Sequence, residues 1–407
     1  MKLLLLPAYF TPELVSDTPL DDARYEAYAE AGMEMELFTS VPTRGVSVED
    51  KKKYSAIKME KMYDGKMTVH RFSMINEGKN PLLRALRYFL CFIKQYYYGR
   101  KLKDVDAIFV VSTPPIQGML AAMLKKKLHC KFIYNLQDIF PDTLVGAGLA
   151  KRGGLLWKIG RKIENYTYRN ADKIIVISEE FKKNILAKGV PEDKIVIVYN
   201  WVDEKAIVPV SKENNPLYEE FGIDRDKFTL VYAGNLGNAQ NIGIVLDGAF
   251  RLPEVQFVIF GTGGLENEIR SRIEKEGLTN VHLHPIQPYE RVSYVYSLGD
   301  ACIVSCKEGL GGSALPSKTW TIMSCGRPVI ASFDEEELKD ILEKNNCGVF
   351  THSGNVNEFV EGIKQLVSDS QHCKEMGNEA RQFILQNLTR EAGTKKFVDI
   401  ITSVVKK

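Results

Sequence analysis

The stretch Phe228-Thr-Leu-Val-Tyr-Ala-Gly234 is an apolar run that ends in a glycine, and the polar turn 235–240 separates it from an apolar-periodic segment, 242–251. A short apolar run, a turn and a helical period are together typical of a buried strand followed by a crossover helix. Parallel strands need such a crossover, because each strand must start again at the same edge of the sheet. We therefore predict a βα unit at residues 228–251.

The same alternation of strand and helix patterns extends through both halves of the chain. Buried strands are predicted at 3–6, 35–39, 107–112, 132–136, 174–178 and 195–199, and again at 228–233, 255–260, 281–284, 301–305, 328–332 and 348–350. Helical periods lie near 20–32, 81–99, 115–128, 153–170, 179–188, 242–251, 264–277, 288–298, 316–325, 335–344 and 355–368. Repeated βα units predict an α/β protein with two Rossmann-like domains, each a parallel sheet covered on both faces.

Residues 206–226 contain two prolines and no clear period, so we place an interdomain linker there. The first domain is then expected at 1–205 and the second at 227–387, with a C-terminal helix near 388–407 that packs back on the first domain. Open α/β sheets bind ligands outside the carboxyl ends of their strands. We expect the two domains to face each other across a cleft that holds the functional site.

Composition limits the classes of function. The chain has 407 residues, of which 26% are charged and 44% hydrophobic, and its net charge of +2 is too small to suggest a nucleic-acid-binding protein. Residues 1–205 carry 33 basic and 25 acidic side chains, whereas 206–407 carry 21 and 27. This asymmetry favours a first domain that faces an anionic partner, and the alternative is chance scatter of surface charge.

Cysteine usage and hydropathy indicate the compartment. The seven cysteines form no CxxC pair and most stand in apolar surroundings, so we expect buried free thiols in a reducing cytosol and no metal site. No stretch approaches the roughly 20 apolar residues of a membrane span, and the N-terminal apolar run is too short for a signal peptide.

Three glycine-containing loops in the second half are candidates for binding phosphate. The first contains Gly234, Asn235 and Gly237, and the second contains Gly261 and Gly263 after the strand 255–260. Glycines at a strand-to-helix turn let backbone N–H groups approach an anion. The second loop lacks the acidic residue that follows in NAD-binding proteins, so a merely tight turn is its alternative interpretation.

The third loop, 307–318, contains Gly311, Gly312 and Ser313 and leads through Pro316 and Ser317 to Lys318. Pro316 suits the first turn of a helix, which places Lys318 near a helix N-terminus. A cation is unfavourable there unless an anion lies beside it. Lys318 is therefore predicted to bind an anion, and the alternative is a solvated lysine on an ordinary loop.

Together, several sequence motifs resemble those of the retaining glycosyltransferases of family 4, the group 1 transferases, which have the two-domain GT-B architecture. The resemblance rests on Asn200-Trp-Val-Asp203, Tyr232-Ala-Gly-Asn-Leu-Gly237, Phe260-Gly-Thr-Gly263, Leu315-Pro-Ser-Lys318 with Met323-Ser-Cys-Gly-Arg-Pro-Val-Ile-Ala331, and Gln137-Asp138-Ile-Phe-Pro141. They span nearly the whole chain in the family's order. The Pro-Ser-Lys and Gln-Asp variants look closest to bacterial O-antigen, capsule and colanic-acid transferases, including N-acetylfucosamine transferases.

The resemblance implies that the second domain binds a nucleotide sugar, more often linked to UDP than to GDP, and that the first binds the acceptor. The family's diphosphate-binding Arg and Lys are replaced here by Asn235 and Gln240, and the two glutamates of its EX7E motif by Ser313 and Thr321. Lys318 and the loop amides are then the candidates for holding the diphosphate. Glu308 becomes a candidate contact to the sugar or ribose.

The resemblance implies catalysis without a metal or other cofactor, and the absence of a DxD motif on a nucleotide-facing loop is consistent with this. Negative charge grows on the departing diphosphate, and a lysine with preorganised amides would stabilise it. Retention of configuration follows from attack on the front face, with the leaving phosphate taking the acceptor proton. Asp138, at a strand end, is the candidate for orienting the acceptor hydroxyl, and its alternative role is capping the turn that follows.

Residues 79–103 contain seven basic side chains and no acidic one, interleaved with aromatic residues. At 100° per residue, Arg84, Arg87, Lys94 and Lys101 share one stripe beside apolar residues. A basic amphipathic helix suits an anionic bilayer surface, so we expect peripheral binding to the inner face of the cell membrane and a lipid-diphosphate-linked acceptor. The alternative is a surface helix with solvated basic residues.

The sequence thus predicts a cytoplasmic, membrane-associated hexosyl or N-acetylhexosaminyl transferase that builds a bacterial surface glycan. Two alternatives stay open: a nucleotide-sugar 2-epimerase, and a non-catalytic GT-B subunit that partners another transferase. An NAD dehydrogenase is disfavoured, because no acidic residue follows the glycine loops at the required place.

Overall fold

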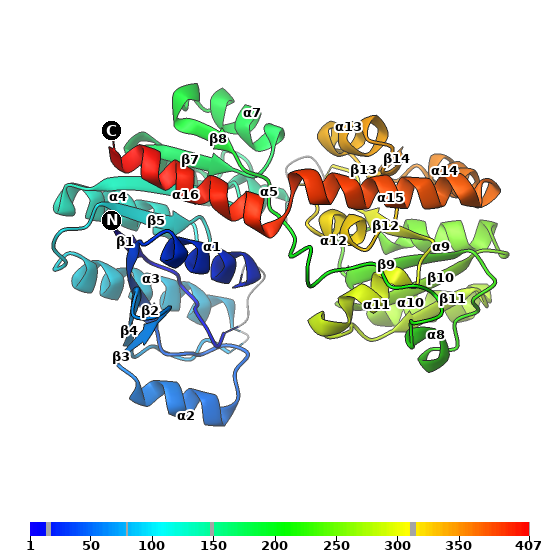
Figure 1. Ribbon diagram of the computed structural model, residues 1–407, viewed down its shortest axis with the longest axis horizontal. Helices are drawn as coiled ribbons and strands as arrows, with labels where there is room; N and C mark the ends of the chain where they lie inside the picture. The colour runs from blue at the N-terminus through cyan, green and yellow to red at the C-terminus, as the bar shows by residue number, and fades with distance from the viewer. Residues whose placement is uncertain (14–17, 79, 147–149, 310–314, 407) are drawn as a thin grey trace. The chain divides into compact units, whose positions relative to one another are not determined.

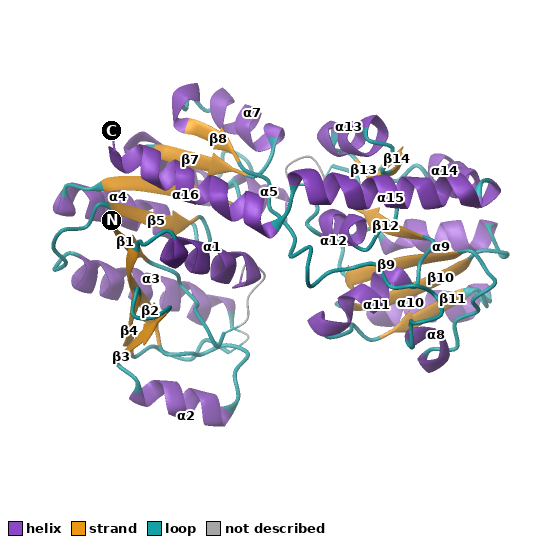
Figure 2. Cartoon of the chain, viewed as in Figure 1, coloured by secondary structure: helices purple, strands orange, loops and turns teal. Residues whose placement is uncertain are grey.

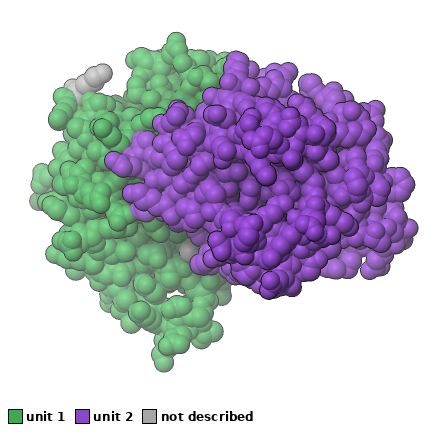
Figure 3. Space-filling view, turned by 45° about the vertical axis from the view of Figure 1, so that its right-hand side comes forward, with its two compact units in different colours: residues 1–199, 393–407 green, residues 200–392 purple. Residues whose placement is uncertain are grey.

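The computed structural model describes residues 1–13, 18–78, 80–146, 150–309 and 315–406. The chain forms two compact units, which Figure 3 distinguishes by colour. Unit 1 comprises Met1–Tyr199 and Gly393–Lys407, and unit 2 comprises Asn200–Ala392.

Unit 1 is built on an eight-stranded sheet with the strand order β3-β4-β2-β1-β5-β6-β7-β8. All neighbouring strands are parallel except β3, which pairs antiparallel with β4. The strands are β1 (Lys2–Leu5), β2 (Glu34–Ser40), β3 (Met59–Met62), β4 (Met67–Phe72), β5 (Ala107–Val111), β6 (Lys131–Leu136), β7 (Lys173–Val176) and β8 (Ile195–Ile197).

Helices cover both faces of this sheet (Figures 1 and 2). They are α1 (Thr18–Glu30), α2 (Val48–Ala56), α3 (Pro81–Gly99), α4 (Ile116–Leu128), α5 (Asp142–Gly146), α6 (Leu155–Asn170), α7 (Glu179–Ala187) and the C-terminal α16 (Arg390–Lys406), with a 3-10 turn η1 (Glu192–Lys194). On one face α4 packs against the sheet and against both α3 and α6. On the other, Phe109 of β5 contacts Tyr28 of α1 and Phe397 of α16, since alternate residues of a strand point to opposite faces.

Unit 2 is built on a six-stranded, fully parallel sheet with the order β11-β10-β9-β12-β13-β14. Its strands are β9 (Thr229–Asn235), β10 (Gln256–Thr262), β11 (Val281–His284), β12 (Ala301–Ser305), β13 (Val329–Phe333) and β14 (Gly348–His352). Its helices are α8 (Leu217–Glu220), α9 (Ile242–Arg251), α10 (Glu266–Glu276), α11 (Val292–Ser297), α12 (Lys318–Ser324), α13 (Glu336–Lys344), α14 (Val356–Ser368) and α15 (Ser370–Asn387), with a 3-10 turn η2 (Tyr289–Arg291).

The predicted α/β architecture with two parallel-sheet domains is confirmed, and each predicted strand and helix is present within a few residues. The sequence patterns did not reveal the β3–β4 hairpin, α2 or α15. All seven cysteines are buried and none forms a disulfide. No described helix has the length and apolar character that crossing a bilayer would demand.

The placement of the linker at 206–226 was wrong, because the structure groups this segment with unit 2. Ile207, Leu217 and Tyr218 are buried, and the hydroxyl of Tyr218 donates to the carbonyl of Leu298 (2.8 Å). These apolar side chains gain more by packing than a solvated connection would allow. The boundary between the units falls instead at residues 199 and 200, and the C-terminal helix from Gly393 onward belongs to unit 1.

Candidate active site

Three loops meet at the carboxyl edge of the unit 2 sheet, where parallel α/β sheets bind ligands. The amide of Leu236, after β9, donates to the carbonyl of Thr262 at the end of β10 (2.9 Å). The hydroxyl of Ser305, at the end of β12, donates to the carbonyl of Gln240 (2.6 Å), and the amide of Lys307 donates to that of Ala239 (2.8 Å). The loop 235–240 is thereby fixed on both sides.

Lys318 is the first residue of α12 and reaches back to this edge. Its ammonium lies 4.3 Å from the centre of the Tyr232 ring, on β9. A Cβ atom added to Gly234 would stand 2.8 Å from that ammonium, so the missing side chain at Gly234 leaves the space that the ammonium uses. Lys318 and Gly234, 84 positions apart in the sequence, are therefore brought together as the interpretation of an anion site requires.

The ammonium of Lys318 has no carboxylate partner among the described residues, and burial lowers its pKa from 10.5 to about 8. The Tyr232 ring compensates only part of the lost hydration, since a cation above a ring gains about 1–2 kcal/mol. A buried cation without a counter-ion is unfavourable in the ligand-free protein. An incoming anion would relieve this cost.

Glycines of the other two loops have a structural reason to be there. A Cβ atom at Gly261 would lie 2.6 Å from the carbonyl oxygen of Gly234, and one at Gly263 would lie 2.4 Å from that of Leu236. The absence of side chains lets the last residues of β9 and β10, and the residues that follow them, approach through their backbones. Gly237 stands beside the amide of Asn235, which donates to the side-chain oxygen of Gln240 (3.3 Å). That Gly234, Asn235, Gly237, Gly261 and Gly263 contact a nucleotide stays a prediction.

The remaining candidates of unit 2 lie near the same edge. Pro316, Ser317 and Thr321 belong to the start of α12, and Ser317 is exposed. Glu308 is exposed in the loop after β12, one residue before Gly309, whose amide donates to Asp334 (2.7 Å). Gly311, Gly312 and Ser313 lie outside the described residues.

In unit 1, Asp138 lies at the carboxyl edge of the sheet, two residues after β6, and its side chain is exposed. The hydroxyl of Ser112, which follows β5, accepts the amide hydrogens of both Gln137 and Asp138 (3.0 Å each). The backbone at Asp138 is thus fixed by a neighbouring strand. Its expected position at a strand end is confirmed, while its role toward an acceptor stays a prediction.

Sequence reasoning missed a buried charged cluster at the same edge of unit 1. Arg87 of α3 is fully buried and donates to the carbonyl of Ala8 (3.0 Å) and the hydroxyls of Ser40 (2.8 Å) and Thr43 (3.1 Å). Two carboxylates, each 1% exposed, flank it: Glu13 at 4.0 Å and Glu77 at 3.8 Å. The cluster ties the loops after β1 and β2 to the first half of α3.

The prediction that Arg87 contacts a membrane surface was wrong, because the cluster encloses its guanidinium. Of the other residues in that stripe, Arg84 lies 3.6 Å from Glu77 and is 37% exposed, and Lys94 donates to the carbonyl of Ser73 (2.7 Å). Lys101 is exposed and its ammonium lies 3.9 Å from the centre of the Tyr97 ring. These three remain at the surface.

Helix α3 buries two polar side chains and leaves several large apolar side chains exposed. Its buried face carries Arg87, Cys91 and Gln95, and the Gln95 amide donates to the carbonyls of Pro7 (2.9 Å) and Phe38 (2.8 Å). The exposed apolar side chains are Leu82 (79%), Leu83 (41%), Leu86 (46%), Phe89 (57%), Ile93 (45%), Tyr97 (46%) and Tyr98 (40%). Contiguous exposed apolar side chains of this kind are typical of binding surfaces.

The described residues contain no group of three or more His, Cys, Asp or Glu side chains placed to hold a metal ion. The charged groups at the carboxyl edges of the two sheets include Lys318 in unit 2 and the carboxylates of Glu13 and Glu77 in unit 1.

Family comparison matches both units. Residues 25–206 match the model described as Glycosyltransferase Family 4, and residues 215–383 match the model described as Glycosyl transferases group 1. The chain belongs to glycosyltransferase family 4. It is thus a glycosyltransferase, as its sequence motifs predict.

Two curated proteins named as glycosyltransferases are similar to most or all of this chain. This glycosyltransferase is 25% identical to the putative colanic acid biosynthesis glycosyl transferase WcaI of Escherichia coli (strain K12), over 98% of this chain and 100% of that protein. It is 20% identical, over 77% of the chain and 80% of the relative, to N-acetylgalactosamine-N,N'-diacetylbacillosaminyl-diphospho-undecaprenol 4-alpha-N-acetylgalactosaminyltransferase of Campylobacter jejuni subsp. jejuni serotype O:2.

Solved structures identify the fold as GT-B. The sucrose-phosphate synthase from Thermosynechococcus elongatus aligns with a TM-score of 0.79 and 14% identity, covering 99% of this chain and 98% of that one. Anabaena HepE in complex with UDP-glucose aligns with a TM-score of 0.73 and 15% identity, covering 99% and 100%. The GT-B architecture predicted from the sequence is confirmed.

Proposed function

We propose that this glycosyltransferase moves a hexose or N-acetylhexosamine from a UDP-sugar to a lipid-diphosphate-linked glycan during synthesis of a bacterial surface polysaccharide. The ammonium of Lys318, at the carboxyl edge of the unit 2 sheet and without a carboxylate partner among the described residues, carries the proposal. The names of the similar proteins support the donor and the acceptor class: one solved structure contains UDP-glucose, and one relative acts on a diphospho-undecaprenol-linked sugar.

In the proposed reaction Lys318 binds the diphosphate and stabilises the negative charge that develops when the bond between the sugar C1 and the diphosphate oxygen breaks. One preorganised donor of this kind contributes about 3 kcal/mol to lowering the barrier. The acceptor oxygen bonds to C1 on the face that the diphosphate leaves, and its proton passes to the leaving phosphate oxygen. The anomeric configuration is retained, and no metal ion is required.

For the acceptor side, we propose that Asp138 accepts a hydrogen bond from the acceptor hydroxyl and orients it. The residue is exposed at the surface of unit 1, and the hydroxyl of Ser112 fixes the backbone that presents it at the carboxyl edge of the sheet. Asp138→Asn is expected to lower kcat more than it raises KM for the donor, since the donor would bind elsewhere.

The donor proposal is tested by titrating the protein with UDP in a calorimeter. Lys318→Met is expected to weaken UDP binding about 10- to 100-fold, because a hydrogen bond to a charged group contributes about 1.5–3 kcal/mol. Lys275→Met, an exposed lysine on α10, is the matched control and should bind UDP as the wild type does. Equal binding by wild type and Lys318→Met would contradict the assignment, and release of an epimerised UDP-sugar without an acceptor would favour the epimerase.

We further propose that α3 attaches the enzyme peripherally to the inner face of the cell membrane. The exposed apolar row of α3 would enter the lipid interface, while Arg84, Lys94, Arg100 and Lys101 meet anionic headgroups. Segment 79–103 has no acidic residue to oppose them. A similar apolar group, Leu155 (75% exposed), Leu156 (61%) and Ile159 (48%), begins α6, which packs with α3 around α4.

Vesicle flotation tests this attachment. Phe89→Glu is expected to abolish flotation with phosphatidylglycerol vesicles, because the substitution places a charge in the lipid interface. Phe250→Glu, at an equally exposed phenylalanine (63%) on α9 of unit 2, is the control and should float normally. Flotation of Phe89→Glu at the wild-type level would exclude α3 as the attachment surface.

A further inference from the structure

Unit 2 contains a cavity of about 660 Å³ at the edge of its sheet opposite to Lys318. The residues immediately before three parallel strands line it: Phe228 before β9, Asp300 before β12 and Pro328 before β13. Because the strands are parallel, their amino ends share one edge, and the proposed donor site lies at the other. The volume falls within the roughly 300–1,000 Å³ typical of sites for small ligands.

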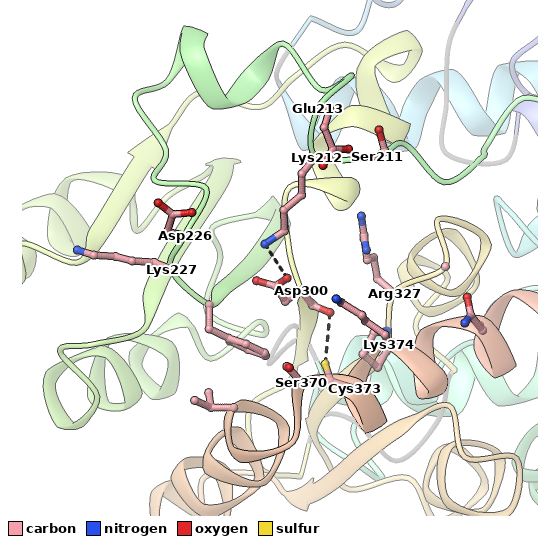
Figure 4. A pocket seen from close by; sticks show the side chains of 15 residues that line it. Ser211, Lys212, Glu213, Asp226, Lys227, Asp300, Arg327, Ser370, Cys373 and Lys374 are labelled. Carbon is pink, nitrogen blue, oxygen red and sulfur yellow. Dashed lines mark hydrogen bonds and ion pairs between the residues drawn. The ribbon is translucent and has the colours of Figure 1, made fainter.

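Cations from three separate segments project into this cavity. Figure 4 shows Lys212 and Lys374 directed toward the region of Asp300 and Arg327 beside them with its guanidinium turned toward the segment of Ser211, whereas Lys227 points away. Lys212 comes from the segment before α8, Arg327 precedes β13, and Lys374 lies in the second turn of α15. No sequence pattern predicts their meeting.

The charges in the cavity are only partly neutralised. The ammonium of Lys212 pairs with Asp300 at 2.9 Å, and the other oxygen of this carboxylate accepts the amide hydrogen of Thr229 (2.9 Å). Lys374 forms no ion pair with any described residue, although Glu213 and Asp226 also line the cavity. The carboxylate nearest to the group of cations is therefore already committed to Lys212 and to the backbone.

The protein holds Arg327 in place through hydrogen bonds that use only part of its guanidinium. One of its terminal nitrogens donates to the carbonyls of Val210 (3.2 Å) and Ser297 (3.0 Å), which fixes the guanidinium. Its Nε is buried and has no hydrogen-bond partner among the described residues. The second terminal nitrogen, Nη1, donates to no described residue, so the side chain still has N–H groups that a ligand can accept from.

We propose that this cavity binds a small phosphorylated metabolite, with its phosphate between Lys374, Arg327 and Lys212. A guanidinium with two ammonium groups is suited to the several oxygens and double charge of a phosphate group. The site lies within unit 2 and does not depend on the proposed donor or acceptor. A ligand there contacts the residues that begin β12 and β13, whose other ends carry the loops of the proposed donor site.

Inorganic phosphate is the probe, and thermal unfolding of the full-length Lys318→Met variant is the measurement, so that the proposed donor site does not contribute. Phosphate at about ten times its dissociation constant is expected to raise Tm by about 2 °C above sodium chloride of equal ionic strength. Adding Lys374→Glu should remove this shift, because it places a carboxylate among the cations. Lys374 is exposed, so its replacement leaves the fold intact.

Adding Lys275→Glu instead is the control and should leave the phosphate shift unchanged. Lys212→Gln provides a second variant and should reduce the shift. The proposal is overturned if phosphate does not raise Tm in the Lys318→Met background, or if the shift persists in both Lys374→Glu and Lys212→Gln. The first of these results would leave the function proposed for Lys318 intact, since that rests on UDP binding.

Discussion

Replacing Lys318 with Met is expected to stabilise the ligand-free enzyme while it weakens UDP binding. The difference between a pKa of 10.5 and one of about 8 corresponds to about 3 kcal/mol of unfavourable interaction for the charged form. Partial exposure of the side chain lets water reduce this cost, so we expect the Met variant to gain about 2 kcal/mol in free energy of unfolding at pH 7. Met has nearly the length of the lysine stem and fills the same space beside Tyr232.

The pH dependence follows from the lowered pKa. Below about pH 8 the lysine is protonated in both the folded and the unfolded chain, and the full cost is present. Between about pH 8 and 10.5 the folded protein releases the proton first, so this group's contribution to stability rises with pH. The stability difference between Lys318→Met and the wild type should therefore be largest below pH 8 and vanish near pH 10.5.

Urea unfolding of both proteins between pH 6.5 and 10 measures this difference, and Lys275→Met again serves as the control. Calorimetry in two buffers of different ionisation enthalpy adds an independent reading: near pH 8, UDP binding to the wild type should take up about half a proton, and binding to Lys318→Met should take up none. If the Met variant is no more stable than the wild type at pH 7, Lys318 is not a buried, uncompensated cation, and the argument for a diphosphate beside it fails.

Two further substitutions test the packing around the candidate sites. Arg87→Met should lower the free energy of unfolding by about 3–5 kcal/mol, because it leaves Glu13 and Glu77 buried without their cation, whereas Arg100→Met on the exposed side of α3 should cost under about 1 kcal/mol. If urea unfolding shows the same loss of stability for Arg87→Met and Arg100→Met, the buried cluster around Arg87 does not stabilise the fold. Gly263→Ala should lower the free energy of unfolding by about 1–3 kcal/mol, because its Cβ would meet the backbone of Leu236. Gly264→Ala is the control and should be nearly neutral, since a Cβ there has no atom within 4 Å. If Gly263→Ala is as stable as the wild type, the loops after β9 and β10 separate easily.

The sequence predicted the regular part of the fold because buried parallel strands are continuous apolar runs. β9 and β10 show this pattern clearly. The hairpin of β3 and β4 escaped prediction because Met59-Glu-Lys-Met62 is too short and too polar to stand out. In the segment 206–226, Ile207, Leu217 and Ile223 are too widely spaced to show a period, although all three are buried.

The candidate site was predictable where one loop carries it and unpredictable where distant segments meet. Lys318 was identified from its place at a helix start. Arg87 was assigned to the surface because it falls on the basic stripe of residues 79–103. Its burial is made tolerable by Glu13 and Glu77, which approach it from other segments. Helical periodicity placed Arg84, Arg87, Lys94 and Lys101 on one stripe, but it does not tell which residues of that stripe are turned inward, and Arg87 is buried while the other three lie at the surface.

Because all seven thiols are buried, the native enzyme should not react with maleimides and other thiol reagents. Burial also raises the pKa of Cys91, Cys325, Cys347 and Cys373 to about 12, far above the pH at which thiolates form in labelling experiments. A cysteine introduced at position 89 would thus carry a fluorophore or spin label at one defined point without prior removal of the native cysteines. Its depth in a bilayer could then be read spectroscopically on an otherwise unaltered protein.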